Sequence, residues 1–200
     1  MKNRKMLLNL LVLVLVAAIS ITGTLAFLTD KTGEVKNTFT VGEVKIDLKE
    51  KKVAENGSVP EGTAAANYTE TEQSYKIFPG GTYNKAPAVL VDADSEECYV
   101  FVKLTNGMET FEATGEGTIA AQMVANGWTL KDETNGIWQY DEIAEPSAVL
   151  PLFDTITIRG DWDGTGTLSD IVIIAAAVQA DNCTAAQALT EATALLTGNK

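Results

Sequence analysis

The sequence predicts a mainly β protein, a β-sandwich or jelly roll with short helical additions. Several short apolar runs alternate with polar residues at a period of two, which is typical of half-buried strands. Turn-forming pairs that contain glycine, asparagine or proline separate these runs. The apolar content of 46% is normal for a chain that folds around a core. We expect a single domain over residues 27–200, because a chain of this length can bury one sizeable core.

The N-terminal residues 1–26 have the order of features found in a secretory signal peptide. Basic residues open the chain, an apolar stretch covers residues 6–21, and small residues lead up to Ala26. We expect a signal helix that is cleaved between Ala26 and Phe27. The alternative is a retained membrane anchor, but the apolar stretch is shorter than the about 20 residues that span a bilayer. The mature protein is therefore predicted to be secreted, with membrane contact only through the uncleaved signal.

An alternating strand pattern lies in the first mature segment, residues 27–48. The parity of its apolar positions changes at Gly42, from Phe39 and Val41 before it to Val44, Ile46 and Leu48 after it. A glycine at a change of register predicts a β-bulge or a bend, where an extra residue is absorbed.

Polar residues then form a predicted long surface loop over 49–74, with a turn signal at Asn56-Gly57. A short apolar return over 75–78 ends at Pro79. Residues 88–91 are predicted to form a brief strand, and the acidic residues 92–97 a turn.

The clearest strand covers residues 98–105, with Cys98, Val100, Val102 and Leu104 on one face. A short helix is predicted over 118–126, and Gly127 is placed to end it in a left-handed conformation. Residues 128–131 and 137–140 flank a turn-rich loop and predict a hairpin.

The C-terminal third predicts further strands over 149–153 and 155–159. Residues 171–179 are apolar on both parities, which predicts a central strand covered on both faces. A capping-box pattern that begins at Thr184 predicts a helix over 184–197, with Gly198 as its stop.

Composition excludes several classes of function. The chain contains no histidine, which removes Ser-His-Asp and Cys-His nucleophiles and histidine-based zinc sites. Its formal net charge is −12, and loss of the three basic residues in 1–26 makes the mature part about −15, which argues against a nucleic-acid partner. We expect no catalytic, cofactor-binding or metal-binding residues. The acidic runs 92–97 and 161–164 suggest calcium ligands, but they lack EF-hand spacing, and solvated turns are the alternative.

Two cysteines, Cys98 and Cys183, lie at the boundaries of predicted strands. An exported protein can join them as a disulfide, and the alternative is two small buried residues.

The N-terminal region carries a resemblance to a known family. Residues 23–30 spell Gly-Thr-Leu-Ala-Phe-Leu-Thr-Asp, and residues 37–48 combine Asn-Thr-Phe-Thr-Val-Gly with the strand that follows. This region resembles the SipW-dependent exported proteins of Gram-positive bacteria, the family of the biofilm fibre protein TasA and of camelysin (CalY). A looser similarity extends over residues 79–87, 98–104 and 151–158.

The resemblance implies a jelly-roll or immunoglobulin-like sandwich that a SipW-like signal peptidase cleaves. It also implies self-association into extracellular or biofilm matrix fibres, in which the freed segment 27–48 is added as a donor strand to the next subunit. The donor side chains would be Phe39, Val41, Val44, Ile46 and Leu48. The metallopeptidase label of camelysin-type relatives is not carried over, because this chain has no histidine to bind zinc.

Three functions follow as hypotheses. The first is a secreted structural fibre subunit. The second is a monomeric surface binding module or adhesin that uses the aromatic hairpin, Trp128, Trp138 and Tyr140, and the loop over 49–74. The third and weakest is a secreted peptidase.

Overall fold

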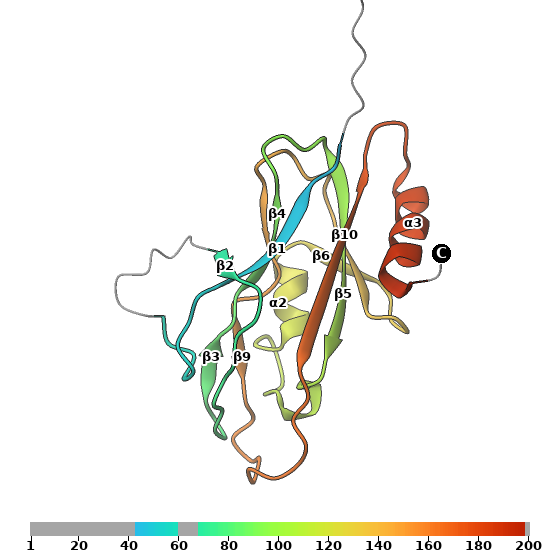
Figure 1. Ribbon diagram of the computed structural model, residues 1–200. Helices are drawn as coiled ribbons and strands as arrows, with labels where there is room; N and C mark the ends of the chain where they lie inside the picture. The colour runs from blue at the N-terminus through green and yellow to red at the C-terminus, as the bar shows by residue number, and fades with distance from the viewer. Residues whose placement is uncertain (1–42, 60–67, 199–200) are drawn as a thin grey trace, which may run out of the picture. The chain divides into compact units, whose positions relative to one another are not determined.

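The structure is a computed structural model that describes residues 43–59 and 68–198. Over these residues the protein is mainly β. Within these residues, antiparallel strands form two four-stranded sheets and one two-stranded sheet. Figure 1 shows how the strands are arranged. The predicted mainly β class is therefore confirmed.

The first four-stranded sheet has the order β2-β1-β4-β8. Its central strands are β1 (Ile46–Lys51) and β4 (Pro87–Val91), which pair over Ile46–Glu50. The edges are the short strands β2 (Tyr68–Glu70) and β8 (Val149–Pro151). A separate ribbon pairs β3 (Thr82–Asn84) with β9 (Thr155–Thr157).

The second four-stranded sheet has the order β10-β5-β7-β6. It consists of β10 (Ile171–Gln179), β5 (Cys98–Asn106), β7 (Ile137–Tyr140) and β6 (Trp128–Asp132). β6 and β7 form the predicted hairpin. β5 and β10 pair without a register shift along their full length of nine residues.

Both four-stranded sheets contribute side chains to one hydrophobic core. Val89 and Val91 of β4 belong to the same buried cluster as Val100 and Val102 of β5. The alternating pattern of β5 points these residues and Cys98 inward, as predicted. Two antiparallel sheets that share a core are consistent with a β-sandwich.

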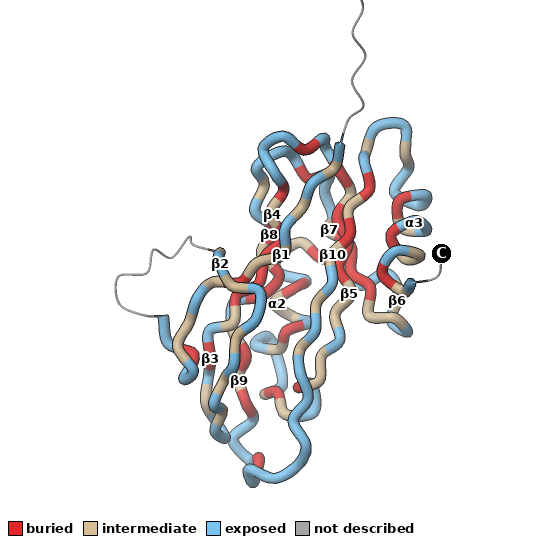
Figure 2. The backbone as a smooth tube through the Cα atoms, in the orientation of Figure 1, coloured by how far each residue is buried: buried red, intermediate tan, exposed pale blue. Residues whose placement is uncertain are grey.

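Two α-helices complete the arrangement of the described residues. α2 (Ile119–Ala125) begins after Thr118, which accepts a hydrogen bond from Ala121 N, and it buries Ile119 and Met123 in the shared core. α3 (Ala185–Thr197) has the predicted capping box and ends at Gly198 in the left-handed conformation. It covers part of the outer face of the β10-β5 pair, where Phe101, Ala176 and Val178 are buried (Figure 2). The 3₁₀ turn η1 (Glu109–Phe111) was not predicted.

The segment after Leu48 differs from the predicted loop. β1 continues to Lys51, and β2 pairs with it at Glu50 and Lys51. The apolar return over 75–78 is not a strand, although Tyr75 and Ile77 pack against the core. These strand boundaries depend on pairing with distant strands, which a local sequence pattern cannot predict.

The prediction that residues 171–179 form a central strand is wrong, because β10 lies at a sheet edge. The apolar side chains at the even-numbered positions of β10 therefore need a different explanation. α3 covers Ala176 and Val178 on the outer face, but Val172 and Ile174 on that face are 47% and 49% exposed. Half of this apolar face is therefore uncovered.

Candidate functional site

The predicted donor segment is only partly within the described residues. Ala26, Phe27, Phe39 and Val41 lie outside them. Val44, Ile46 and Leu48 pack, half-buried, against the core, and β1 pairs with β4 of its own chain. The residues from Ile46 onward therefore belong to the protein's own sheet, and a donor strand would have to come from the residues before them.

The sequence left open whether Cys98 and Cys183 form a disulfide, and in the structure the two cysteines are not bonded to each other. Cys98 lies at the start of β5 and points into the core shared by the two sheets. Cys183 follows β10 and packs beside the cluster under α3, on the opposite face of the sheet. A bond between the two sulfur atoms would have to cross the sheet. Burial raises the pKa of the Cys98 thiol to about 11, so that thiol stays protonated at neutral pH.

The acidic runs form ordinary turns. Asp94 N donates to Asp92 Oδ1, and Thr165 N donates to Asp163 Oδ1, at 2.9 Å each. Among the described residues, no group of three or more histidine, cysteine or acidic side chains is placed to hold a metal ion.

The aromatic hairpin packs inward rather than forming an exposed surface. Trp128 and Trp138 are 1% and 6% exposed. The Trp128 indole nitrogen donates to Pro151 O at 2.8 Å, and its ring meets that of Tyr140 edge to face. These indoles serve the core and are not available to bind a sugar or a peptide.

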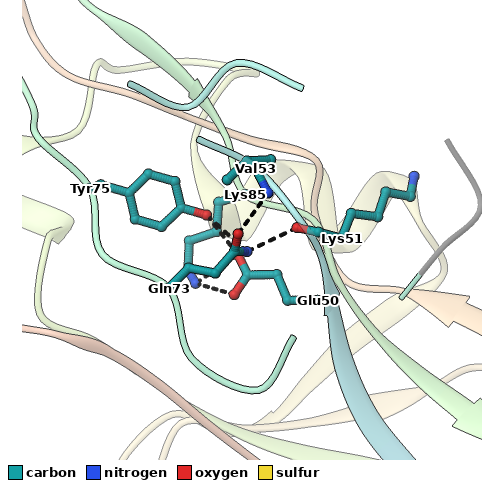
Figure 3. A network of polar contacts seen from close by, with 6 residues as sticks. All are labelled: Glu50, Lys51, Val53, Gln73, Tyr75 and Lys85. Atoms are coloured by element: carbon teal, nitrogen blue, oxygen red, sulfur yellow. Dashed lines mark hydrogen bonds and ion pairs between the residues drawn. The ribbon is translucent and has the colours of Figure 1, made fainter. Parts of the chain in front are cut away.

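A buried polar network, which the sequence did not indicate, joins β1 to the segments around it (Figure 3). Glu50 is 6% exposed. Lys85 Nζ donates to both of its carboxylate oxygens at 3.0 Å, and Tyr75 Oη donates to Oε1 at 2.9 Å. Burial, followed by the negative charge of Glu50, raises the pKa of Tyr75 well above its ordinary value.

Gln73 extends this network to the backbone. Its amide nitrogen donates to Lys51 O at 2.9 Å, and its amide oxygen accepts from Val53 N at 2.7 Å. These contacts fix residues 73–75 against the end of β1.

The exposed edge of β10 is the most unusual surface of the described chain. Ala180 N donates to Glu97 O, and Asp170 O accepts from Gly107 N. Even-numbered residues of β10 therefore direct their backbone groups toward β5, and odd-numbered residues direct theirs outward. Within the described residues, no hydrogen bond satisfies these outward groups. β1 lies close to β10 without being hydrogen-bonded to it (Figure 1).

The other outer strands of the two large sheets carry features that discourage pairing with another chain. β8 has three residues, and Pro151 occupies an outward position where no N–H is available. β6 carries Lys131 and Asp132 and a register shift between Leu130 and Asp132. β2 has only three residues. β10, in contrast, has nine residues with no charge, no proline and no register shift.

Both faces of the first half of β10 are incompletely covered. Inward-pointing Ile171, Ile173 and Ala175 pack against the core but remain half-buried. Val172 and Ile174 are exposed on the outer face. By comparison, Val100 and Val102 of neighbouring β5 are fully buried. An additional strand beside β10 would complete this cover.

The sequence made this edge visible only in part. The nine uncharged residues over 171–179 are evident in the sequence. However, a strand with apolar side chains on both faces can be either a central strand or an edge strand beneath a helix. For Glu50, Tyr75 and Lys85 no local signal exists, because the three residues are far apart in the chain.

Comparison with protein-family models, with curated proteins and with solved structures finds no significant match for the chain. No helix in the described part of the chain is long and apolar enough to cross a membrane.

Proposed function

We propose that this protein is a secreted structural subunit of an extracellular, biofilm-type matrix fibre, and that it assembles by strand addition. Its sandwich would be of the jelly-roll or immunoglobulin-like type, as the resemblance to the SipW-dependent exported proteins implies. A SipW-like signal peptidase would cleave between Ala26 and Phe27 and release the segment that follows. On this proposal the protein is not an enzyme.

One observation carries the proposal, the open edge of β10. A long, uncharged edge strand is a template for another chain, and soluble proteins usually block such edges. The other outer strands of the two large sheets are short, bulged, charged or occupied by proline. A chain that blunts these edges, and whose described residues leave the outer edge of β10 unpaired, is suited to add a strand there.

Electron microscopy and sedimentation of the mature protein, residues 27–200, test this function. We expect concentration-dependent fibres, because each added subunit would satisfy open backbone groups of the previous one. Deletion of residues 27–42, which include the donor side chains Phe39 and Val41, should abolish the fibres by removing the donor segment.

A second variant replaces residues 27–42 by a glycine-serine segment of the same length, which keeps the chain length but removes the side-chain pattern of the donor segment. This variant should also fail to assemble. A mature wild-type protein that stays monomeric at all concentrations, or a deletion variant that forms fibres of normal length, would contradict the proposal.

A further inference from the structure

Asparagine followed by glycine occurs four times in the chain, at Asn56-Gly57, Asn106-Gly107, Asn126-Gly127 and Asn135-Gly136. Such pairs are prone to deamidation, because the glycine N–H is not shielded by a side chain and can attack the neighbouring carboxamide. We propose that the fold selects Asn135, in the loop between β6 and β7, as the site where the chain deamidates. This inference goes beyond the proposed fibre function and does not depend on it.

The state of the glycine N–H distinguishes the four pairs. Three of these groups donate to a backbone carbonyl oxygen: Gly57 to that of Ala54 at 2.8 Å, Gly107 to that of Asp170 at 3.1 Å, and Gly127 to that of Val124 at 3.1 Å. Gly136 N has no hydrogen-bond acceptor among the described residues. A donating N–H must first lose its hydrogen bond before its nitrogen can act as a nucleophile, so the Gly136 nitrogen is the most available of the four.

The asparagine side chains at the other pairs separate this explanation from simple exposure. Asn106 Nδ2 donates to Glu112 Oε1, and Asn126 Nδ2 donates to Leu152 O at 3.0 Å, so both carboxamides are held inside the fold. Asn56, in contrast, is exposed, whereas Asn135 is half-buried. Exposure alone would therefore select Asn56, and availability of the N–H selects Asn135.

The reaction needs only water and hydroxide from the solvent. Gly136 N gives its proton to hydroxide and bonds to Cγ of Asn135. The bond between Cγ and Nδ2 then breaks, and Nδ2 takes a proton from water and leaves as ammonia. Water opens the resulting cyclic imide at either carbonyl carbon, which produces an aspartate or, with the main chain routed through the side-chain carbon, an isoaspartate.

The carboxamide that would be lost holds the loop closed. Asn135 Nδ2 donates to Asp132 Oδ2 at 2.6 Å, and Asn135 N donates to Asp132 Oδ1 at 3.1 Å. These hydrogen bonds keep the pKa of Asp132 below its ordinary value. A carboxylate in place of the carboxamide would face Asp132 with a second negative charge, so a hydrogen bond would be replaced by a repulsion.

The backbone of the loop has no room for the isoaspartate product. Gly136 has a φ of 65°, and a Cβ atom at this position would collide with Leu104 O. Leu104 N also donates to Gly136 O at 2.9 Å. The additional main-chain atom of isoaspartate would displace Gly136 and break this contact with β5. Both products should therefore loosen the loop.

Ageing of the purified protein at mildly alkaline pH tests the site. Peptide mapping by mass spectrometry measures aspartate and isoaspartate at each of the four pairs. We expect Asn135 to react about fivefold or more faster than each other pair, the factor that corresponds to one hydrogen bond of about 1 kcal/mol. In concentrated urea, where these hydrogen bonds are lost, the four rates should become similar.

Two variants test the consequence for the loop. Asn135→Asp places the product carboxylate beside Asp132 and should lower the melting temperature by about 2–4 °C, the shift that the loss of one such hydrogen bond gives in a chain of this size. Asn56→Asp is the matched control, because Asn56 Oδ1 accepts from Ser58 N and Ser58 Oγ and a carboxylate can accept the same bonds. The control should melt like wild type.

The alternative outcomes decide between the fold and simple exposure. A faster reaction at Asn56 than at Asn135 would overturn the proposal, because exposure would then select the site. Equal rates or no reaction in the folded protein would also overturn it, as would a preference for Asn135 that persists in urea. If Asn135→Asp melts like wild type, the loosening of the loop is overturned. None of these results depends on whether the protein forms fibres.

Discussion

At the scale of single residues, Glu50 is the best example of a side chain that only the folded structure explains. It lies on β1 between polar neighbours, where the sequence suggests a solvated position. In the structure its carboxylate is buried and accepts hydrogen bonds from Lys85 Nζ and Tyr75 Oη. Desolvation makes such a pair costly to form, but breaking it is more costly, because one charge stays buried without a partner.

Glu50→Ala should therefore lower the free energy of unfolding by about 3 kcal/mol, toward the lower end of the range for a broken buried pair because Lys85 is not fully enclosed. Urea denaturation followed by fluorescence measures this change. Glu43→Ala, which breaks the exposed pair with Lys45, is the control and should change stability by less than about 1 kcal/mol.

The double variant Glu50→Leu with Lys85→Met separates the ion pair from simple packing. It removes both charges together and should recover most of the lost stability. Equal losses in Glu50→Ala and Glu43→Ala would contradict the structural role of the buried network.

The cysteines show what residue patterns can and cannot predict. The alternating pattern correctly places Cys98 on the inward face of β5. The position of Cys183 depends on how the chain turns after β10, which no local pattern encodes. Strand boundaries alone therefore left a disulfide open, although the two thiols lie on opposite faces of the sheet.

At the scale of elements, the sequence predicts best where the local chemistry is complete. α3 has its cap, its amphipathic spacing and its glycine stop within one short segment, and all three are confirmed. β5 and the β6–β7 hairpin are predicted for the same reason. β10 was placed wrongly, because a strand beneath α3 and a strand between two neighbours produce the same apolar pattern.

Thr184→Ala tests how strongly the cap holds α3. Thr184 Oγ1 accepts from Gln187 N at 3.3 Å, and Gln187 Oε1 in turn accepts from Thr184 N at 3.0 Å. Losing this reciprocal cap should cost about 1 kcal/mol and lower the melting temperature measured by circular dichroism. Thr190→Ala, at an exposed position inside the same helix, is the control and should be neutral or slightly stabilising. A Thr184→Ala variant that melts with wild type would show that packing over β5 and β10 alone holds the helix.

At the scale of the whole molecule, the positions of most strands were predictable, but the short strands β2 and β3 and the order of strands in the sheets were not. Strand existence depends on local periodicity. Sheet order depends on contacts between distant segments, such as β1 with β4 and β5 with β10. The proposed assembly edge is a property of sheet order, so it becomes visible only in the structure.

Net charge adds a condition to any assembly of this protein. The formal charge of the whole chain is −12, and residues 27–200 alone are more acidic still because residues 1–26 contain basic residues and no acidic ones. Two copies that approach each other repel through this charge, whereas β10 carries no charged side chain whose interactions salt would screen. Screening shortens the repulsion to a range of about 8 Å at physiological ionic strength.

Fibre growth of the mature protein should therefore accelerate when sodium chloride is raised from about 0.01 M to 0.15 M, as the screening length falls from about 30 Å to 8 Å. Light scattering at a fixed protein concentration follows the growth rate. Magnesium chloride at matched ionic strength is the control for specific ion bridges, and sucrose at matched osmolality is the control for excluded volume. Growth that slows with added sodium chloride would show that attractive ion pairs, rather than the uncharged edge of β10, hold the subunits together.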